Sequence, residues 1–184
     1  MTEIDRMLAA NEAWLDEFPG DLPVAPAREV AVVACMDSRM PLFGMLGLDV
    51  GDAHVIRNAG GVVTEDTLRS LAISQHVLGT RAVVLVHHTD CGLNKATDQE
   101  VADLVERTTG HRPPWVARTF TDVDADVRES IRLIRETPYL LSTEVRGTVY
   151  DVASGRLREV EDPAAPHLSE ARGGSLQQGQ EQGS

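Results

Sequence analysis

Two cysteines and one histidine stand where two predicted strands end. Cys35 follows the apolar run 30–34, and His88 and Cys91 follow the apolar run 83–86. Thiolate sulfur and imidazole nitrogen are ligands that zinc prefers, and three protein ligands leave the fourth tetrahedral position open for water or substrate. The residues therefore predict a catalytic zinc site, whereas a fully closed site would need a further ligand from Asp37, His87 or Asp90.

Other polar residues near these strand ends have structural interpretations. His87 alternates with His88 along a strand, so it should point to the opposite face and be packed or hydrogen-bonded. Asp90 is favoured as a turn residue that bonds local backbone, with orientation of a metal ligand as the alternative. His54 and His76 fall inside a predicted strand and a predicted helix, so they are expected to be structural.

The elements that position these residues alternate between strand and helix. Nearly continuous apolar runs predict buried strands, and apolar residues at helical spacing with acidic first turns predict helices. The alternation predicts an α/β fold with a mainly parallel sheet flanked by helices on both faces, closed by a C-terminal edge hairpin. The predicted strands are 29–36, 53–57 and 81–88, the helices are 64–78 and 122–136, and the hairpin strands are 144–152 and 156–160.

The ends of the chain differ in character from this central part. Residues 2–18 have the pattern of an amphipathic helix, and the prolines of 19–28 predict an extended connector. Residues 1–28 are therefore expected to form a helical arm, 29–162 the zinc-binding α/β domain, and 163–184, rich in Pro, Gly, Ser and Gln, a flexible tail.

Composition narrows the classes of partner. The chain has 184 residues and a formal net charge of −12, which disfavours nucleic acid because no basic face is available. No apolar run reaches the roughly 18 residues that a membrane-spanning helix needs. The acidic N-terminus lacks the pattern of a secretory signal, so we expect a cytoplasmic protein that acts on a small molecule.

Two short motifs resemble the paired zinc motifs of β-class carbonic anhydrases. They are Cys35-Met36-Asp37-Ser38-Arg39 and His88-Thr89-Asp90-Cys91-Gly92, and the intervening Arg57-Asn58-Ala59-Gly60-Gly61 is also similar. The resemblance covers roughly residues 29–95, and the compactness of the chain resembles the short actinobacterial-type members. It implies a homodimer or homotetramer in which the arm packs on a neighbouring subunit.

The resemblance also implies a ligand set and a reaction. One Zn²⁺ per chain would be held by Cys35, His88 and Cys91, with Asp37 and Arg39 as a carboxylate and guanidinium pair beside the metal-bound water. The implied activity is reversible hydration of carbon dioxide to bicarbonate and a proton by zinc hydroxide. Two thiolates cancel the charge of the ion, so alkaline pH should favour activity, and low pH should favour a form in which Asp37 closes the site.

Two alternatives remain at the level of sequence. Some relatives in this superfamily resemble carbonyl sulfide or carbon disulfide hydrolases, which would use the same metal site on a sulfur analogue. A non-catalytic zinc or thiol sensor would instead close Cys35 and Cys91 with Asp37, or bridge the two cysteines on oxidation. The lining of the site separates the first two activities, and catalytic silence would indicate the sensor.

Overall fold

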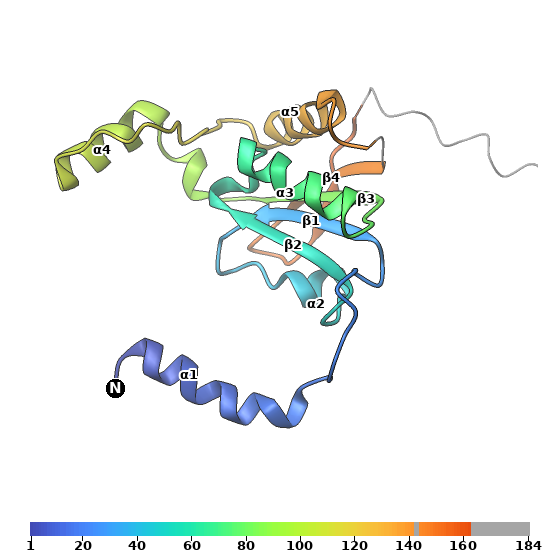
Figure 1. The fold of residues 1–184 in the computed structure, drawn as a ribbon. Helices are drawn as coiled ribbons and strands as arrows, with labels where there is room; N and C mark the ends of the chain where they lie inside the picture. The colour runs from blue at the N-terminus through green and yellow to red at the C-terminus, as the bar shows by residue number, and fades with distance from the viewer. Residues whose placement is uncertain (142–143, 163–184) are drawn as a thin grey trace, which may run out of the picture.

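The computed structural model describes residues 1–141 and 144–162, and in these ranges five strands form one sheet (Figure 1). The strand order is β2-β1-β3-β4-β5, in which the first four strands are parallel and β5 is antiparallel to β4. The predicted α/β class, the mainly parallel sheet and the edge hairpin are confirmed. The strands are β1 (Val30–Cys35), β2 (Ala53–Asn58), β3 (Ala82–His88), β4 (Glu144–Tyr150) and β5 (Leu157–Glu159).

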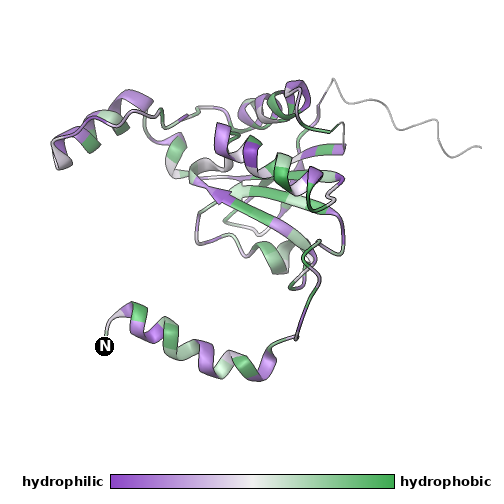
Figure 2. Ribbon diagram, viewed as in Figure 1, coloured by the Kyte–Doolittle hydropathy of each residue, from purple (hydrophilic) through white to green (hydrophobic). Residues whose placement is uncertain are grey.

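Helices cover both faces of the sheet because the central strands bury apolar side chains on each side (Figures 1 and 2). On one face, α3 (Glu65–His76) and α5 (Val123–Glu136) pack Leu71 and Ile131 against alternate strand residues such as Val33. On the other face, the short α2 (Leu42–Leu46) and the segment before it pack Leu42 and Met40 against Val32.

Local sequence signals set the beginnings of the two long helices on the sheet. The Thr64 side chain accepts a hydrogen bond from the Thr67 N–H at the start of α3, and Asp122 accepts from Asp124 and Ala125 at the start of α5. The observed bounds of both helices lie within two residues of the predicted ones, since caps and apolar spacing are local features of the chain.

Two further helices stand apart from the sheet in Figure 1. Helix α1 (Glu3–Trp14) begins at a capping box formed by Thr2 and Asp5, and α4 (Asp98–Thr109) begins at another formed by Thr97 and Glu100. Neither helix has a buried residue within the described part of the chain. Helix α1 was predicted from the sequence as the helical arm, whereas α4 was not predicted, although a capping box marks its start.

The predicted tail, 163–184, lies outside the described residues. Among 1–141 and 144–162, no helix is both long enough and apolar enough to cross a bilayer.

Candidate metal centre

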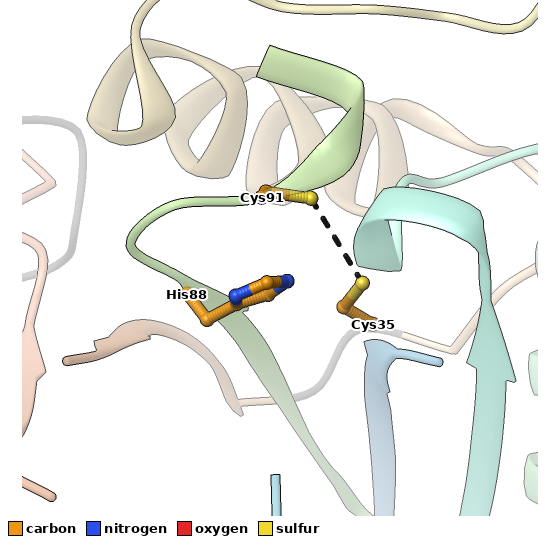
Figure 3. A group of neighbouring side chains, drawn as sticks. All are labelled: Cys35, His88 and Cys91. Atoms are coloured by element: carbon orange, nitrogen blue, oxygen red, sulfur yellow. Dashed lines mark hydrogen bonds between the residues drawn. The ribbon is translucent and has the colours of Figure 1, made fainter. Parts of the chain in front are cut away.

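The three predicted metal ligands come together at the carboxyl ends of β1 and β3 (Figure 3). Cys35 is the last residue of β1, His88 is the last residue of β3, and Cys91 follows three residues later. All three are buried, and one donor atom from each lies within 4.8 Å of the other two. Because β1 and β3 are parallel neighbours, their carboxyl ends share one edge of the sheet, which brings distant parts of the sequence together.

The geometry of these donors fits zinc. The Cys35 and Cys91 sulfurs are 3.9 Å apart. Two sulfur ligands at the usual zinc distance in a tetrahedral site are about 3.8 Å apart, so the thiols need almost no movement to bind one ion.

The ring of His88 is oriented for metal binding. Its Nδ1 lies 2.9 Å from the Thr89 carbonyl oxygen, which can only accept, so Nδ1 carries the proton and donates it. The Nε2 atom is then left with a lone pair, and it is buried without a hydrogen-bond partner among the described residues. A buried nitrogen without a partner is costly unless something binds it, and the two neighbouring sulfurs make a metal ion the chemically suitable partner.

The two thiols differ in proton affinity. A hydrogen bond from Cys91 lowers the pKa of Cys35 to about 4, against the opposing effect of burial. The same contact, together with burial, raises the pKa of Cys91 well above its usual range. Burial opposes protonation of His88, but the nearby Cys35 thiolate favours the charged ring, outweighs burial and raises the His88 pKa. The metal-free cluster therefore retains protons that a metal ion must displace.

Asp37 and Arg39 form a tight pair beside this cluster. The Arg39 side chain donates from Nε to Oδ1 of Asp37 at 3.0 Å and from Nη2 to Oδ2 at 2.7 Å. The Arg39 main-chain N–H donates a third bond, to Oδ1, at 2.9 Å. These bonds hold the pKa of Asp37 well below its usual range. One Asp37 oxygen lies 3.7 Å from Nε2 of His88. An ionised carboxylate thus lies next to the three candidate ligands.

Arg57 and Gly61 support the loop that carries Cys35 and Asp37. Arg57, in β2, donates from Nε to the carbonyl of Cys35 at 3.0 Å and from Nη2 to the carbonyl of Asp37 at 2.7 Å. Gly61 has a positive φ of 72°, and a Cβ there would lie 2.8 Å from the main-chain nitrogen of Cys35. Only glycine fits so close to this backbone. Both residues belong to the motif 57–61, but its residue types predict no role for Arg57, because the Arg57 contacts are with a neighbouring strand and the loop after it.

His87 and Asp90, which neighbour the candidate ligands in sequence, both bond side chains from other segments. The His87 side chain points away from the metal cluster and bonds Asp126 of α5 at 2.7 Å, so its predicted packed, hydrogen-bonded role is confirmed. Asp90 has a positive φ of 57°, as a turn residue would. Its side chain, however, bonds Arg39 at 2.9 Å and Lys95 at 2.5 Å. The local backbone bond favoured for Asp90 is thus replaced by bonds to side chains, one of them from the β1 loop.

The two other histidines have structural contacts. His54 bonds the buried Ser74 hydroxyl at 2.8 Å through Nδ1. Nε2 of His76 lies 2.9 Å from the Tyr139 carbonyl oxygen, to which it donates. Both lie outside the cluster at the sheet edge, as expected.

Known proteins that resemble this chain include carbonic anhydrases, in sequence and in structure. A family model described as carbonic anhydrase matches residues 30–157. Beta-carbonic anhydrase 1 of Mycobacterium tuberculosis strain H37Rv is 48% identical over 161 residues, which cover 87% of this chain and 99% of that protein. A carbon disulfide hydrolase of Acidithiobacillus thiooxidans is 33% identical over 153 residues, which cover 71% and 76%. The solved structure of a carbonic anhydrase from Streptococcus mutans has a TM-score of 0.84 at 41% identity, covering 88% of this chain and 99% of that chain.

An open α/β sheet that presents two cysteines and a histidine at its carboxyl edge defines a scaffold for a metal-dependent enzyme. With the family match and the 48% identical relative, the class becomes specific: the chain belongs to the carbonic anhydrase family, in its β-class. Enzymes of this class use zinc.

Proposed function

We propose that this protein catalyses the reversible hydration of carbon dioxide to bicarbonate and a proton, with one Zn²⁺ per chain bound by Cys35, His88 and Cys91. The observation that carries the proposal is the buried Cys-His-Cys cluster with an arginine-held carboxylate beside it. The match to carbonic anhydrases over most of the chain supports the same reaction. Three protein donors leave the fourth tetrahedral position open, as catalytic zinc sites require.

Asp37 and Arg39 would act directly on the reacting oxygen. A zinc ion bound at this site supplies a Lewis acid that ionises water near neutral pH. Asp37, ionised by its bonds to Arg39, is placed to accept a hydrogen bond from the attacking oxygen and so direct its lone pair at the carbon of carbon dioxide. Arg39 keeps that carboxylate in its charged form, because its guanidinium holds both oxygens. Cys35 and Cys91 would each contribute a negative charge, which reduces the effect of the ion on the acidity of water. We therefore expect the rate to rise above neutral pH.

The test is a stopped-flow assay of carbon dioxide hydration on zinc-loaded protein, with metal content measured on the same sample. We expect one zinc per chain and a hydration rate that the His88→Ala variant loses together with most of its zinc. An Asp66→Asn variant, which removes an exposed carboxylate from α3, should keep both. Stoichiometric zinc without any hydration would contradict the proposed reaction and leave the hydrolase of a sulfur analogue and the sensor as candidates.

Carbon disulfide or carbonyl sulfide hydrolysis is the second candidate. The specific support is the 33% identical relative named carbon disulfide hydrolase. The same metal ligands would serve, because attack of an activated oxygen on the central carbon is common to all three substrates. Release of hydrogen sulfide from carbonyl sulfide or carbon disulfide, faster than hydration of carbon dioxide at equal concentration, would favour this candidate.

The assembly and the compartment are also proposals. We infer a homodimer or homotetramer, because α1 exposes a row of apolar side chains that a second copy of the chain would cover. We infer a cytoplasmic location, because Cys35 and Cys91 must stay reduced to bind a metal and reducing compartments maintain thiols. The proposed domain limits stay as predicted from the sequence, with 1–28 as the arm, 29–162 as the zinc domain and 163–184 as a tail.

A further inference from the structure

Arg39 joins the two loops that carry the metal ligands. Its Nε and Nη2 atoms donate to Asp37 in the same loop. Its Nη1 atom donates to Oδ2 of Asp90 at 2.9 Å. The Nη2 atom also donates to the main-chain carbonyl of Asp90 at 3.1 Å. Asp90 lies in the turn between His88 and Cys91, so one guanidinium connects the end of β1 with the end of β3.

The Asp90 side chain is itself fixed from the other side. Its Oδ1 pairs with the Lys95 ammonium at 2.5 Å, while Oδ2 takes the bond from Arg39. The positive φ of Asp90 turns its main-chain carbonyl and its side chain toward the same guanidinium. Both oxygens of this carboxylate are therefore engaged, one by each cation.

Without Asp90, Asp37 alone would hold the Arg39 guanidinium among the described residues. The Arg39 side chain is 46% exposed, and a long exposed side chain has many rotamers available. Asp37 is less exposed, at 17%, and one of its oxygens already lies 3.7 Å from His88 Nε2. A carboxylate released by its arginine would be close to the three metal ligands and is itself a zinc ligand.

We propose that Asp90 is a positioning residue, which holds Arg39 by its side-chain and main-chain oxygens so that Arg39 keeps Asp37 turned away from the metal. The inference rests on the proposed function only in that the Cys-His-Cys cluster binds a divalent ion. It assigns to the turn between two ligands the task of keeping the fourth coordination position accessible.

The test is binding of thiocyanate to cobalt-loaded protein, followed by the change in visible absorption. An Asp37 carboxylate on the metal must be displaced before the anion binds, so we expect the Asp90→Asn variant to bind thiocyanate about tenfold more weakly than the wild type. Removal of a negative charge near the site would by itself strengthen anion binding. The expected sign is therefore opposite to the simple charge effect.

Two further variants separate this role from a general structural one. In an Asp37→Ala background the Asp90→Asn change should no longer weaken thiocyanate binding, because the carboxylate that would close the site is absent. Asparagine tolerates a positive φ, and Asp90→Gly gives a second variant that keeps this backbone conformation without a side chain and should show the same loss. The exposed Asp66→Asn variant should bind thiocyanate as the wild type does.

Unchanged or tighter thiocyanate binding in Asp90→Asn and Asp90→Gly would overturn the proposal, and so would a loss that persists in the Asp37→Ala background. The anion titration needs no turnover. A wild-type protein that binds thiocyanate as expected but hydrates no carbon dioxide would therefore fail the proposed function and leave the role of Asp90 standing.

Discussion

At the scale of single residues, the site depends on contacts that set which atoms carry protons. The Thr89 carbonyl fixes the proton of His88 on Nδ1 and leaves Nε2 for a metal. Arg39 and its partners keep Asp37 ionised beside it. Cys35 and Cys91 share a contact that makes one sulfur a thiolate and leaves the other protonated. The cluster is thus prepared to bind a cation by releasing protons.

The affinity for zinc should therefore depend on pH. The raised pKa of Cys91 means that this thiol carries a proton at neutral pH in the metal-free protein, and zinc must displace it. Raising the pH lowers the cost of that displacement, so the logarithm of the apparent zinc affinity should increase by at least about one per pH unit between roughly pH 6 and 8, and more steeply where His88 is also protonated. Competition with a chelator of known affinity measures this slope.

A control and a contrary result define that prediction. In a Cys91→Ala variant the residual affinity should be much weaker. The slope should stay near one, because Cys35 loses the hydrogen bond that lowers its pKa and then carries the proton that zinc displaces. An affinity that does not change with pH in the wild type would show that Cys91 is already a thiolate before the metal arrives.

At the scale of elements, the packing of α5 on β4 depends on a glycine. Gly147 lies in β4, and a Cβ at this position would lie 2.1 Å from a methyl group of Val127 and 3.1 Å from a methyl group of Ile131, both in α5. The absent side chain lets the helix approach the sheet closely. The methyl groups of Val127 sit directly on its Cβ, so this buried side chain can relieve the clash only by leaving its rotamer.

The Gly147→Ala variant should accordingly be less stable. We expect the free energy of unfolding to fall by roughly 1–3 kcal/mol, the usual cost of an added methyl group in a well-packed core. Chemical denaturation of the two proteins, with equal metal content, measures the difference.

The same substitution elsewhere provides the control. Gly44, in α2, has open space around its Cβ position, so Gly44→Ala should be neutral or more stable by up to about 1 kcal/mol. In a Val127→Ala background, which removes the clashing methyl, Gly147→Ala should cost less. An equal cost in both backgrounds would show that the loss arises from the strand and not from the contact with α5.

At the scale of the whole molecule, the exposed surface of α1 is unusual for a chain that works alone. Ile4, Leu8 and Leu15 are 68%, 68% and 55% exposed, and helical spacing places them on one side of α1 and the turn after it. Figure 1 shows this helix extending from the sheet at the end of an extended connector. Such a row of apolar side chains favours association with another subunit.

A Leu8→Glu variant should therefore shift the protein toward monomers. We expect association about tenfold weaker or more, since a carboxylate in an apolar interface loses its hydration without gaining a partner. Sedimentation velocity over a range of protein concentrations measures the change. The matched control is Ala13→Glu, which places the same charge on the opposite side of α1 and should leave the assembly intact. A wild type that is monomeric at all concentrations would contradict the inferred oligomer.

Sequence alone determined the features of this protein that are encoded locally. Residue types and spacing predict the three main strands, the beginnings of α3 and α5, and Cys35, His88 and Cys91 as candidate ligands, because burial and helix-start signals act between near neighbours. Helix α4 had a readable capping box at Thr97 and Glu100, so its absence from the prediction was a missed local signal.

Only the tertiary structure decided which distant groups meet. The 3.9 Å contact between the two sulfurs, the support of the Cys35 loop by Arg57 and the bond from Arg39 to Asp90 all join segments that are 20 to 60 residues apart. The space at Gly147 likewise depends on how α5 lies on β4. These contacts depend on strand order and register, which arise from packing of the whole sheet and are not encoded by any short stretch of residues.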